Sequence, residues 1–260
     1  EMGLKAYRFS IAWARILPQG RGEVNEAGLA FYEKIVDCCR AHGIEPMVTL
    51  YHWDLPQALQ DLYGGWESPD SIDDFVYYAK VVFARLGKKV KYWITFNEQN
   101  IFTKFGWLTA MHPPGKFAEE KLFYQVNHHI NLAHAKTVLQ FKEMVKNGKI
   151  GASFAYSPAY AFDCCPENVS SRQEYDEFEN YWWLDVYGYG TYPKRALKYL
   201  QAKGVMAPVK KADLQLMKEA AAALDFIGIN YYRSVVCEYN PPDGAMPYAK
   251  MNTTGERGKE

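Results

Sequence analysis

Residues 92–100 read YWITFNEQN, an apolar run that ends in a polar pair, and this stretch decides the fold class. We predict a buried strand over residues 90–96, because β-branched and aromatic side chains dominate it. Asn97 and Glu98 follow where the strand ends, and α/β folds collect their functional groups at the carboxyl ends of strands. An isolated Asn-Glu pair is more often an exposed strand end, so the rest of the chain must supply the context.

Outward from this strand, short apolar runs alternate with long amphipathic ones. Expected strands cover residues 6–11, 46–51, 90–96, 149–156 and 225–231, and expected helices cover 26–42, 71–86, 119–146, 174–187, 194–203 and 213–223. Strands joined by helices need crossover connections, which predicts a single α/β domain over residues 1–260 with a parallel sheet. Residues 240–260, rich in Pro, Gly and charge, are expected to be irregular or frayed.

Two further strands carry groups that a plain core does not need. Arg8 lies inside the first strand, where a charge is costly unless it is paired, so we expect a carboxylate partner. The alternative is an Arg at a strand edge that faces water. His52 and Trp53 close the next strand and could offer a ligand one hydrogen bond and one stacking wall. The alternative for that pair is a core Trp beside a satisfied His.

The last expected strand carries Asn230 and Tyr232, two residues apart. Side chains with that spacing share one face of a strand, so we expect both to point to the same side and Tyr231 to point toward the helices. If that side is the face of the sheet turned away from the helices, both Asn230 and Tyr232 reach the site.

Glu98 is the sharpest chemical feature, because Trp93 and Phe96 flank it. Removal of water disfavours the charged form of a carboxyl and raises its pKa. A carboxyl that stays protonated near neutral pH can donate its proton to a leaving-group oxygen. Asn97 beside it can hydrogen-bond a sugar hydroxyl, so the pair suits the cleavage of a glycosidic bond.

Composition argues against several kinds of partner. Lys plus Arg and Asp plus Glu number 30 each, which gives no electrostatic reason to expect nucleic acid or an anionic membrane. No apolar run reaches the roughly 18 residues that span a bilayer. Aromatic residues make up 16% of the chain, a content that suits stacking on sugar rings, although composition alone favours the alternative of a Tyr-rich core.

Metal, cofactor and disulfide chemistry are not expected. The five cysteines form two vicinal pairs and a singleton, which is neither a disulfide framework nor a zinc motif and favours a reducing, cytoplasmic setting. His129 and His134 are five residues apart on the long helix expected over 119–146, a poor spacing for a metal site.

Five segments together resemble glycoside hydrolase family 1, the retaining β-glucosidases. They are residues 7–13 (YRFSIAW), 52–57 (HWDLPQ), 64–66 (GGW), 95–98 (TFNE) and 225–232 (DFIGINYY), in the family's order. The resemblance implies a (β/α)8 TIM barrel, here incomplete with about five of eight β/α units, that hydrolyses a small-molecule β-glycoside with retention.

The resemblance also implies roles for individual residues. It makes Glu98 the acid/base and makes Asn97 and His52 ligands of sugar hydroxyls. It gives Arg8 and Tyr232 the task of holding the nucleophile. Trp53 and Asn230 join the expected substrate-binding set.

The family's nucleophile is missing from this chain. Retention needs two carboxylates about 5–5.5 Å apart, and in the family the second is a Glu in a Thr-Glu-Asn-Gly-like segment of the seventh strand. After Tyr232 the only Glu residues are Glu238, Glu256 and Glu260, none in that context. The chain corresponds to strands two to six, so we interpret it as a piece of a longer protein and expect it to be inactive alone.

The residues after Glu98 bear on the substrate. Many relatives that act on unphosphorylated sugars have Pro after the acid/base Glu, whereas this chain has Gln99 and Asn100, a variant that resembles bacterial 6-phospho-β-glucosidases. A 6-phosphorylated β-glucoside is therefore the expected substrate. The alternatives are a β-glucosidase or β-galactosidase of unphosphorylated sugars, and a non-catalytic sugar-binding fragment. Assembly into a homo-oligomer stays open.

Overall fold

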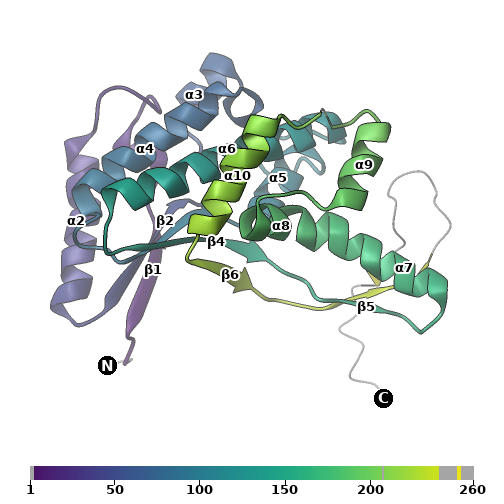
Figure 1. Cartoon of the computed structure of the whole chain (residues 1–260). Coiled ribbons are helices and arrows are strands. Elements are labelled where there is room, and N and C mark those ends of the chain that lie inside the picture. Colours follow the sequence, from purple (N-terminus) through teal and green to yellow (C-terminus); the bar gives the residue numbers. More distant parts are fainter. Residues whose placement is uncertain (1–2, 207, 240–250, 253–260) are drawn as a thin grey trace.

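The computed structural model of the chain describes residues 3–206, 208–239 and 251–252. Its centre is a five-stranded parallel sheet in the order β1-β2-β3-β4-β6 (Figure 1). The strands are β1 (Ala6–Ser10), β2 (Glu45–Tyr51), β3 (Tyr92–Asn97), β4 (Lys149–Ala155) and β6 (Phe226–Asn230). The predicted α/β class and parallel sheet are confirmed, with each predicted strand in place.

Helices cover one side of this sheet (Figure 1). The α-helices of the described residues are α1 (Trp13–Ile16), α2 (Glu26–Ala41), α3 (Gln57–Tyr63), α4 (Asp70–Leu86), α5 (Gln99–Trp107), α6 (Glu120–Met144), α7 (Pro166–Tyr175), α8 (Trp182–Tyr189), α9 (Lys194–Ala202) and α10 (Lys211–Ala223). Of these, α7 packs on a second, smaller sheet (Figure 1). Helix α6 packs between α4 and α10 and buries His134, Val138 and Phe141. In the described part of the chain no helix lies across the opposite face of the sheet.

Burial falls from the central strands to the edges. Five of the six residues of β3 are buried, whereas none of the residues of β1 or β6 is. The outer strands each have a sheet neighbour on one side only, so their side chains keep more contact with water. The core is aromatic where β2 and β3 meet α4: the rings of Phe75 and Phe96 stack with centroids 4.5 Å apart.

The region after β4 departs most from the sequence-based prediction. The helix expected over 174–187 is a helix α7 that begins at Pro166, a π-helical turn (Asp176–Tyr181) and then α8. Proline at the first helical position is favourable because its missing N–H needs no partner there. The short helices α1, α3 and α5 also went unpredicted, since four to nine residues carry little periodicity.

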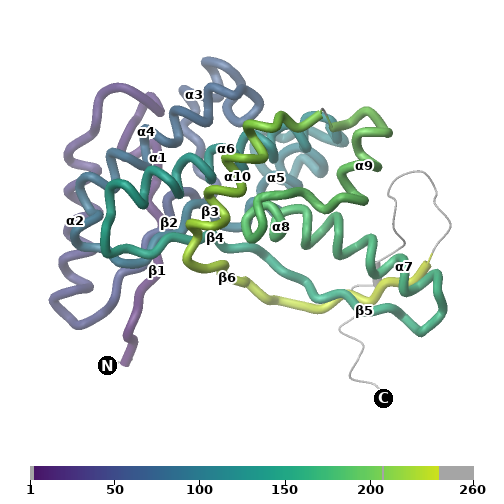
Figure 2. The backbone as a smooth tube through the Cα atoms, in the orientation of Figure 1, coloured from purple at the N-terminus to yellow at the C-terminus, as the bar shows by residue number. Residues whose placement is uncertain are grey.

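A second, smaller sheet continues from the first. It joins β5 (Ala159–Ala161), β7 (Val235–Cys237) and β8 (Met251–Asn252) in the order β5-β7-β8. In Figure 2 the segments after β4 and β6 run side by side to β5 and β7, which pair in parallel. The prediction of irregular structure over residues 240–260 falls outside the described residues, apart from β8.

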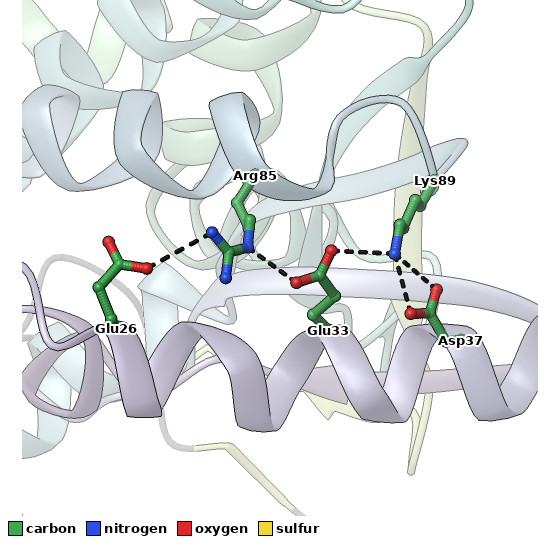
Figure 3. A network of polar contacts seen from close by, with 5 residues as sticks. All are labelled: Glu26, Glu33, Asp37, Arg85 and Lys89. Carbon is green, nitrogen blue, oxygen red and sulfur yellow. Dashed lines mark hydrogen bonds and ion pairs between the residues drawn. The ribbon is translucent and has the colours of Figure 1, made fainter.

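A row of ion pairs connects α2 to the C-terminal end of α4 (Figure 3). Arg85 contacts Glu26 at 3.4 Å and Glu33 at 2.8 Å, and Lys89 contacts Glu33 at 2.9 Å and Asp37 at 2.8 Å. Exposed pairs of this kind are screened by water and salt, so each contributes little to stability. They help to align the two helices.

Candidate active site

The side chain of Arg8, on β1, forms hydrogen bonds to side chains on β2, β3 and β4. Its Nε donates to Oγ1 of Thr49 at 3.0 Å, and its second terminal nitrogen donates to Oδ1 of Asn97 at 2.6 Å and to Oγ of Ser153 at 3.0 Å. Arg8 lies on the outer strand β1 and is exposed, as in the alternative of an Arg at a strand edge. Its three acceptors are neutral, so the expected carboxylate partner is not among the described residues. Partial burial lowers the pKa of Arg8, while Glu98 and Tyr232 oppose that change. The positive charge of Arg8 is therefore left without an ion-pair partner in this part of the chain.

Asn97 links Arg8 to His52. Its Oδ1 accepts from Arg8 and from Ser153 Oγ at 3.0 Å, and its Nδ2 lies 3.2 Å from His52 Nε2. The amide nitrogen can only donate, so Nε2 of His52 must accept, which requires a neutral imidazole. Partial burial and the charge of Arg8 both lower the pKa of His52, against the opposing influence of Glu98.

Glu98 is 6% exposed and directly follows β3. Its backbone has φ 49° and ψ 58°, a left-handed conformation that non-glycine residues adopt rarely. Its N–H donates to the carbonyl oxygen of Ser153 at 2.7 Å, and Nδ2 of Asn230 donates to Oε1 of its carboxylate at 2.6 Å. The structure therefore brings Glu98 and Asn230 into direct contact beside Asn97.

Trp53 forms one wall of this region. It also has a left-handed backbone, with φ 82°, and its Nε1 donates to the carbonyl oxygen of Asn97 at 2.7 Å. Its ring lies 5.2 Å from that of His52 and 5.0 Å from that of His112, between centroids. Trp53 is thus fixed in position, with its indole against two imidazole rings.

The sequence predicted that Tyr232 shares one face of the last strand with Asn230, and the structure does not place it there. Strand β6 ends at Asn230, so Tyr232 follows the strand and the alternation of faces does not extend to it. Its side chain is 79% exposed, and Tyr231 is 59% exposed. Both residues follow an edge strand, and among the described residues Tyr232 makes no hydrogen bond to Arg8.

Asp54, which we did not single out from the sequence, lies directly after Trp53. Burial raises the pKa of its carboxyl to about 6, although the backbone N–H groups of His52, Asp54 and Trp13 favour the charged form. Its Oδ1 is buried and has no hydrogen-bond partner in the described structure. Nothing in the sequence indicated this burial, because an Asp in a polar segment between strand and helix is usually solvated.

Comparison with known proteins identifies the family. The sequence profile of "Glycosyl hydrolase family 1" matches residues 1–259. This chain belongs to glycosyl hydrolase family 1. Over 258 residues, 99% of the chain, it is 50% identical to "Aryl-phospho-beta-D-glucosidase BglC" of Bacillus subtilis, of which it covers 53%. It is 39% identical over 245 residues to "Beta-glucosidase A" of Thermotoga maritima, covering 93% of this chain and 53% of that protein.

Solved structures agree with the family assignment. A family 1 β-glucosidase from Thermotoga maritima superposes with a TM-score of 0.86 at 36% identity, covering 98% of this chain and 55% of that one. A rice β-glucosidase superposes with a TM-score of 0.86 at 36% identity, covering 92% of this chain and 52% of that one. The family-1 chain spans about half the length of these relatives, and its fold is a partial (β/α)8 TIM barrel, as predicted.

Two hydroxyl residues of the family-1 site were missed in the sequence. Thr49 and Ser153 both bind Arg8. A signal was present, because Ser153 is the one hydroxyl residue of the otherwise largely apolar strand β4, and Thr49 lies in the largely apolar strand β2. Both side chains are buried and therefore need hydrogen-bond partners, and Arg8 supplies one to each.

Other groups singled out in the sequence lie outside the site. His129 contacts the carbonyl oxygen of Trp66 at 2.9 Å, and His134 contacts Oγ1 of Thr95 at 2.8 Å. No group of three His, Cys, Asp or Glu residues suited to a metal occurs in the described regions. The five cysteines are free of disulfides. Within residues 3–206, 208–239 and 251–252, no helix is both long and apolar enough to cross a membrane.

Proposed function

We propose that this chain is part of a retaining β-glycosidase in which Glu98 is the general acid/base. The observation that carries the proposal is the short contact from Asn230 to the buried Glu98 carboxylate, at 2.6 Å, next to the Arg8–Asn97–His52 array. A fixed carboxyl beside several hydrogen-bonding groups suits proton donation to a glycosidic oxygen. The same group can then accept a proton from water in the second step.

Arg8 has no ion-pair partner among the described residues, so its positive charge suits the binding of the nucleophilic carboxylate that this mechanism also needs. A retaining enzyme holds its nucleophilic carboxylate about 5–5.5 Å from the acid/base. The guanidinium of Arg8 is tied to three neutral oxygens, so its charge remains available to attract an anionic side chain. We assign Arg8, together with Tyr232, to hold a nucleophile supplied from outside this chain, and His52, Trp53, Asn97 and Asn230 to bind the sugar.

For the substrate we propose a 6-phospho-β-glucoside, such as phosphorylated cellobiose or a phosphorylated aryl glucoside, hydrolysed in the cytoplasm. The support is the 50% identity to a Bacillus subtilis protein named as an aryl-phospho-β-D-glucosidase. Gln99 supports this substrate only because its position after Glu98 resembles the sequences of bacterial 6-phospho-β-glucosidases. Its side chain is fully buried and faces α6 and α8, so it does not itself contact a phosphate at the site.

The test compares the complete protein on p-nitrophenyl 6-phospho-β-glucoside and on p-nitrophenyl β-glucoside. We expect turnover of the phosphorylated substrate at least tenfold more efficient in kcat/KM, and loss of that turnover in Glu98→Gln. The matched control is Glu143→Gln on the exposed face of α6. Equal or better turnover of the unphosphorylated glucoside would refute the assignment of substrate, and full activity of Glu98→Gln would refute the assignment of mechanism.

A second candidate is a β-glucosidase or β-galactosidase of unphosphorylated sugars. It is favoured by relatives of 35–39% identity that are named as β-glucosidases. The assay on the two p-nitrophenyl glucosides separates this candidate from a 6-phospho-β-glucosidase. A third substrate, p-nitrophenyl β-galactoside, separates a β-glucosidase from a β-galactosidase. A non-catalytic sugar-binding protein would bind the glucosides and release no nitrophenol.

A further inference from the structure

We propose that Gln99 is a positioning residue whose buried side-chain amide fixes the start of α5 and so holds Glu98 in its left-handed conformation. The inference rests on the proposed function only for its catalytic consequence, since the geometry stands without it. Gln99 is the first residue of α5, it is fully buried, and it follows directly on Glu98.

Both ends of the Gln99 amide are bonded to other helices. Its Nε2 donates to Oδ1 of Asn127 at 3.0 Å and to Oδ1 of Asn131 at 3.0 Å, both on α6. Its Oε1 accepts from the hydroxyl of Tyr187 on α8 at 2.5 Å. An apolar side chain of the same length would fill the space but would leave these buried partners short of hydrogen bonds, which is unfavourable for each unsatisfied group.

Asn127 spreads the connection further. Its Oδ1 also accepts from Nε1 of Trp183 at 2.7 Å and from Oγ1 of Thr103 at 3.3 Å. The first turn of α5 is therefore tied to α6 and α8 by a polar network inside the helix layer, remote from water. A network of this kind specifies one arrangement of its helices, because each alternative leaves a buried polar group unpaired.

Glu98 needs such support on its C-terminal side. A left-handed conformation is unfavourable for a non-glycine residue and persists where the surroundings hold it. On the strand side, the N–H of Glu98 is held by the carbonyl oxygen of Ser153. On the helix side, the hydrogen bonds of Gln99 and the bond from Nδ2 of Asn100 to the carbonyl oxygen of Ala155, at 2.7 Å, perform the same task.

The direction of the Glu98 carboxyl follows from this arrangement. Glu98 is the N-cap of α5, yet its side chain makes no capping hydrogen bond, and its carbonyl oxygen accepts from the N–H groups of Ile101 and Phe102. The carboxyl is thus left to Asn230 and to a substrate. If α5 begins differently, the backbone of Glu98 relaxes and its carboxyl moves away from Asn230.

The first experiment separates positioning from plain stabilisation by the choice of leaving group. A misplaced general acid slows the departure of a poor leaving group such as phenol, whereas 2,4-dinitrophenol departs with little help. In the complete protein, we expect Gln99→Met to lose at least tenfold in kcat/KM on the phenyl β-glycoside and less than threefold on the dinitrophenyl β-glycoside. Ser71→Ala, which removes the hydrogen bond of a buried side chain on α4 outside this network, is the control and should affect both substrates equally.

A second variant and a second measurement keep the test decisive. Gln99→Glu keeps the acceptor for Tyr187 but loses donation to α6, so it should show the same split between substrates if Gln99→Met does not fold. Amide hydrogen exchange of residues 98–103 requires no substrate and should be faster in the variants than in the wild type. Equal losses on the two glycosides, or unchanged exchange, would overturn the role of Gln99. Inactivity of the wild type on every glycoside would instead overturn the proposed function.

Discussion

The substitution Asp54→Asn offers a quantitative test of the burial beside the site. Burial raises the pKa of Asp54 from 3.8 to about 6. Each tenfold change in proton affinity is worth about 1.4 kcal/mol, so the ionised carboxylate costs the folded state up to about 3 kcal/mol. Because the folded protein holds the proton more tightly than the unfolded chain, stability falls as the pH rises from about 4 to 6 and stays lower above that.

Asparagine is neutral at every pH and removes this penalty. Its buried amide group lacks the same partner that Oδ1 lacks now, so that cost cancels between the two proteins. We therefore expect a gain of up to about 3 kcal/mol at pH 8 and of less than about 1 kcal/mol at pH 4. The assay is urea unfolding of the complete protein at both pH values. Asp61→Asn, at an exposed position on α3, is the control. A gain of equal size at both pH values, or no gain at pH 8, would refute the reasoning.

Three further changes test the polar array and the surface ion pairs. Asn230→Ala removes the hydrogen bond to the Glu98 carboxyl, worth about 0.5–1.5 kcal/mol, so kcat/KM of the complete protein should fall about 2- to 10-fold; an unchanged value would show that this hydrogen bond does not contribute to catalysis. Arg8→Lys keeps the charge but cannot reproduce three bonds from one planar group, so a loss of at least tenfold is expected, and activity close to wild type would contradict the need for the fork. The pKa of Glu33 is lowered by its hydrogen bonds to Lys89 and Arg85, so Glu33→Gln should lower the melting temperature slightly in low salt and not at 1 M salt, and a difference that persists in high salt would rule out an electrostatic cause.

The sequence predicted the sheet well because the decisive information is local. Strand β3 is a continuous apolar run, and its polar end at Asn97 and Glu98 marks the edge of the sheet where the other polar strand ends collect. Periodicity and turn residues are sufficient for this kind of inference. They also sufficed for the long helices α2, α4 and α6, but not for the region of α7 and α8.

The details of the site depend on contacts between distant parts of the chain. The partners of Arg8 lie 41, 89 and 145 residues away, so no local pattern could show that its acceptors are neutral. The left-handed backbone of Trp53 was equally hidden, because a bulky residue gives no sign that it will adopt one. The position of Gln99, inside the helix layer, follows from the packing of α6 and α8 and could not be derived from its neighbours.

The outer strand β6 has a consequence for the synthesis of the complete protein. A ribosome adds about 5–20 residues per second, so each hundred residues made after β6 would take about 5–20 s to appear. A central sheet that folds early would leave β6 without an outer neighbour for that time, and its backbone N–H and C=O groups could pair with another nascent chain. The yield of folded protein should therefore depend on the rate of translation and on chaperones that shield β6.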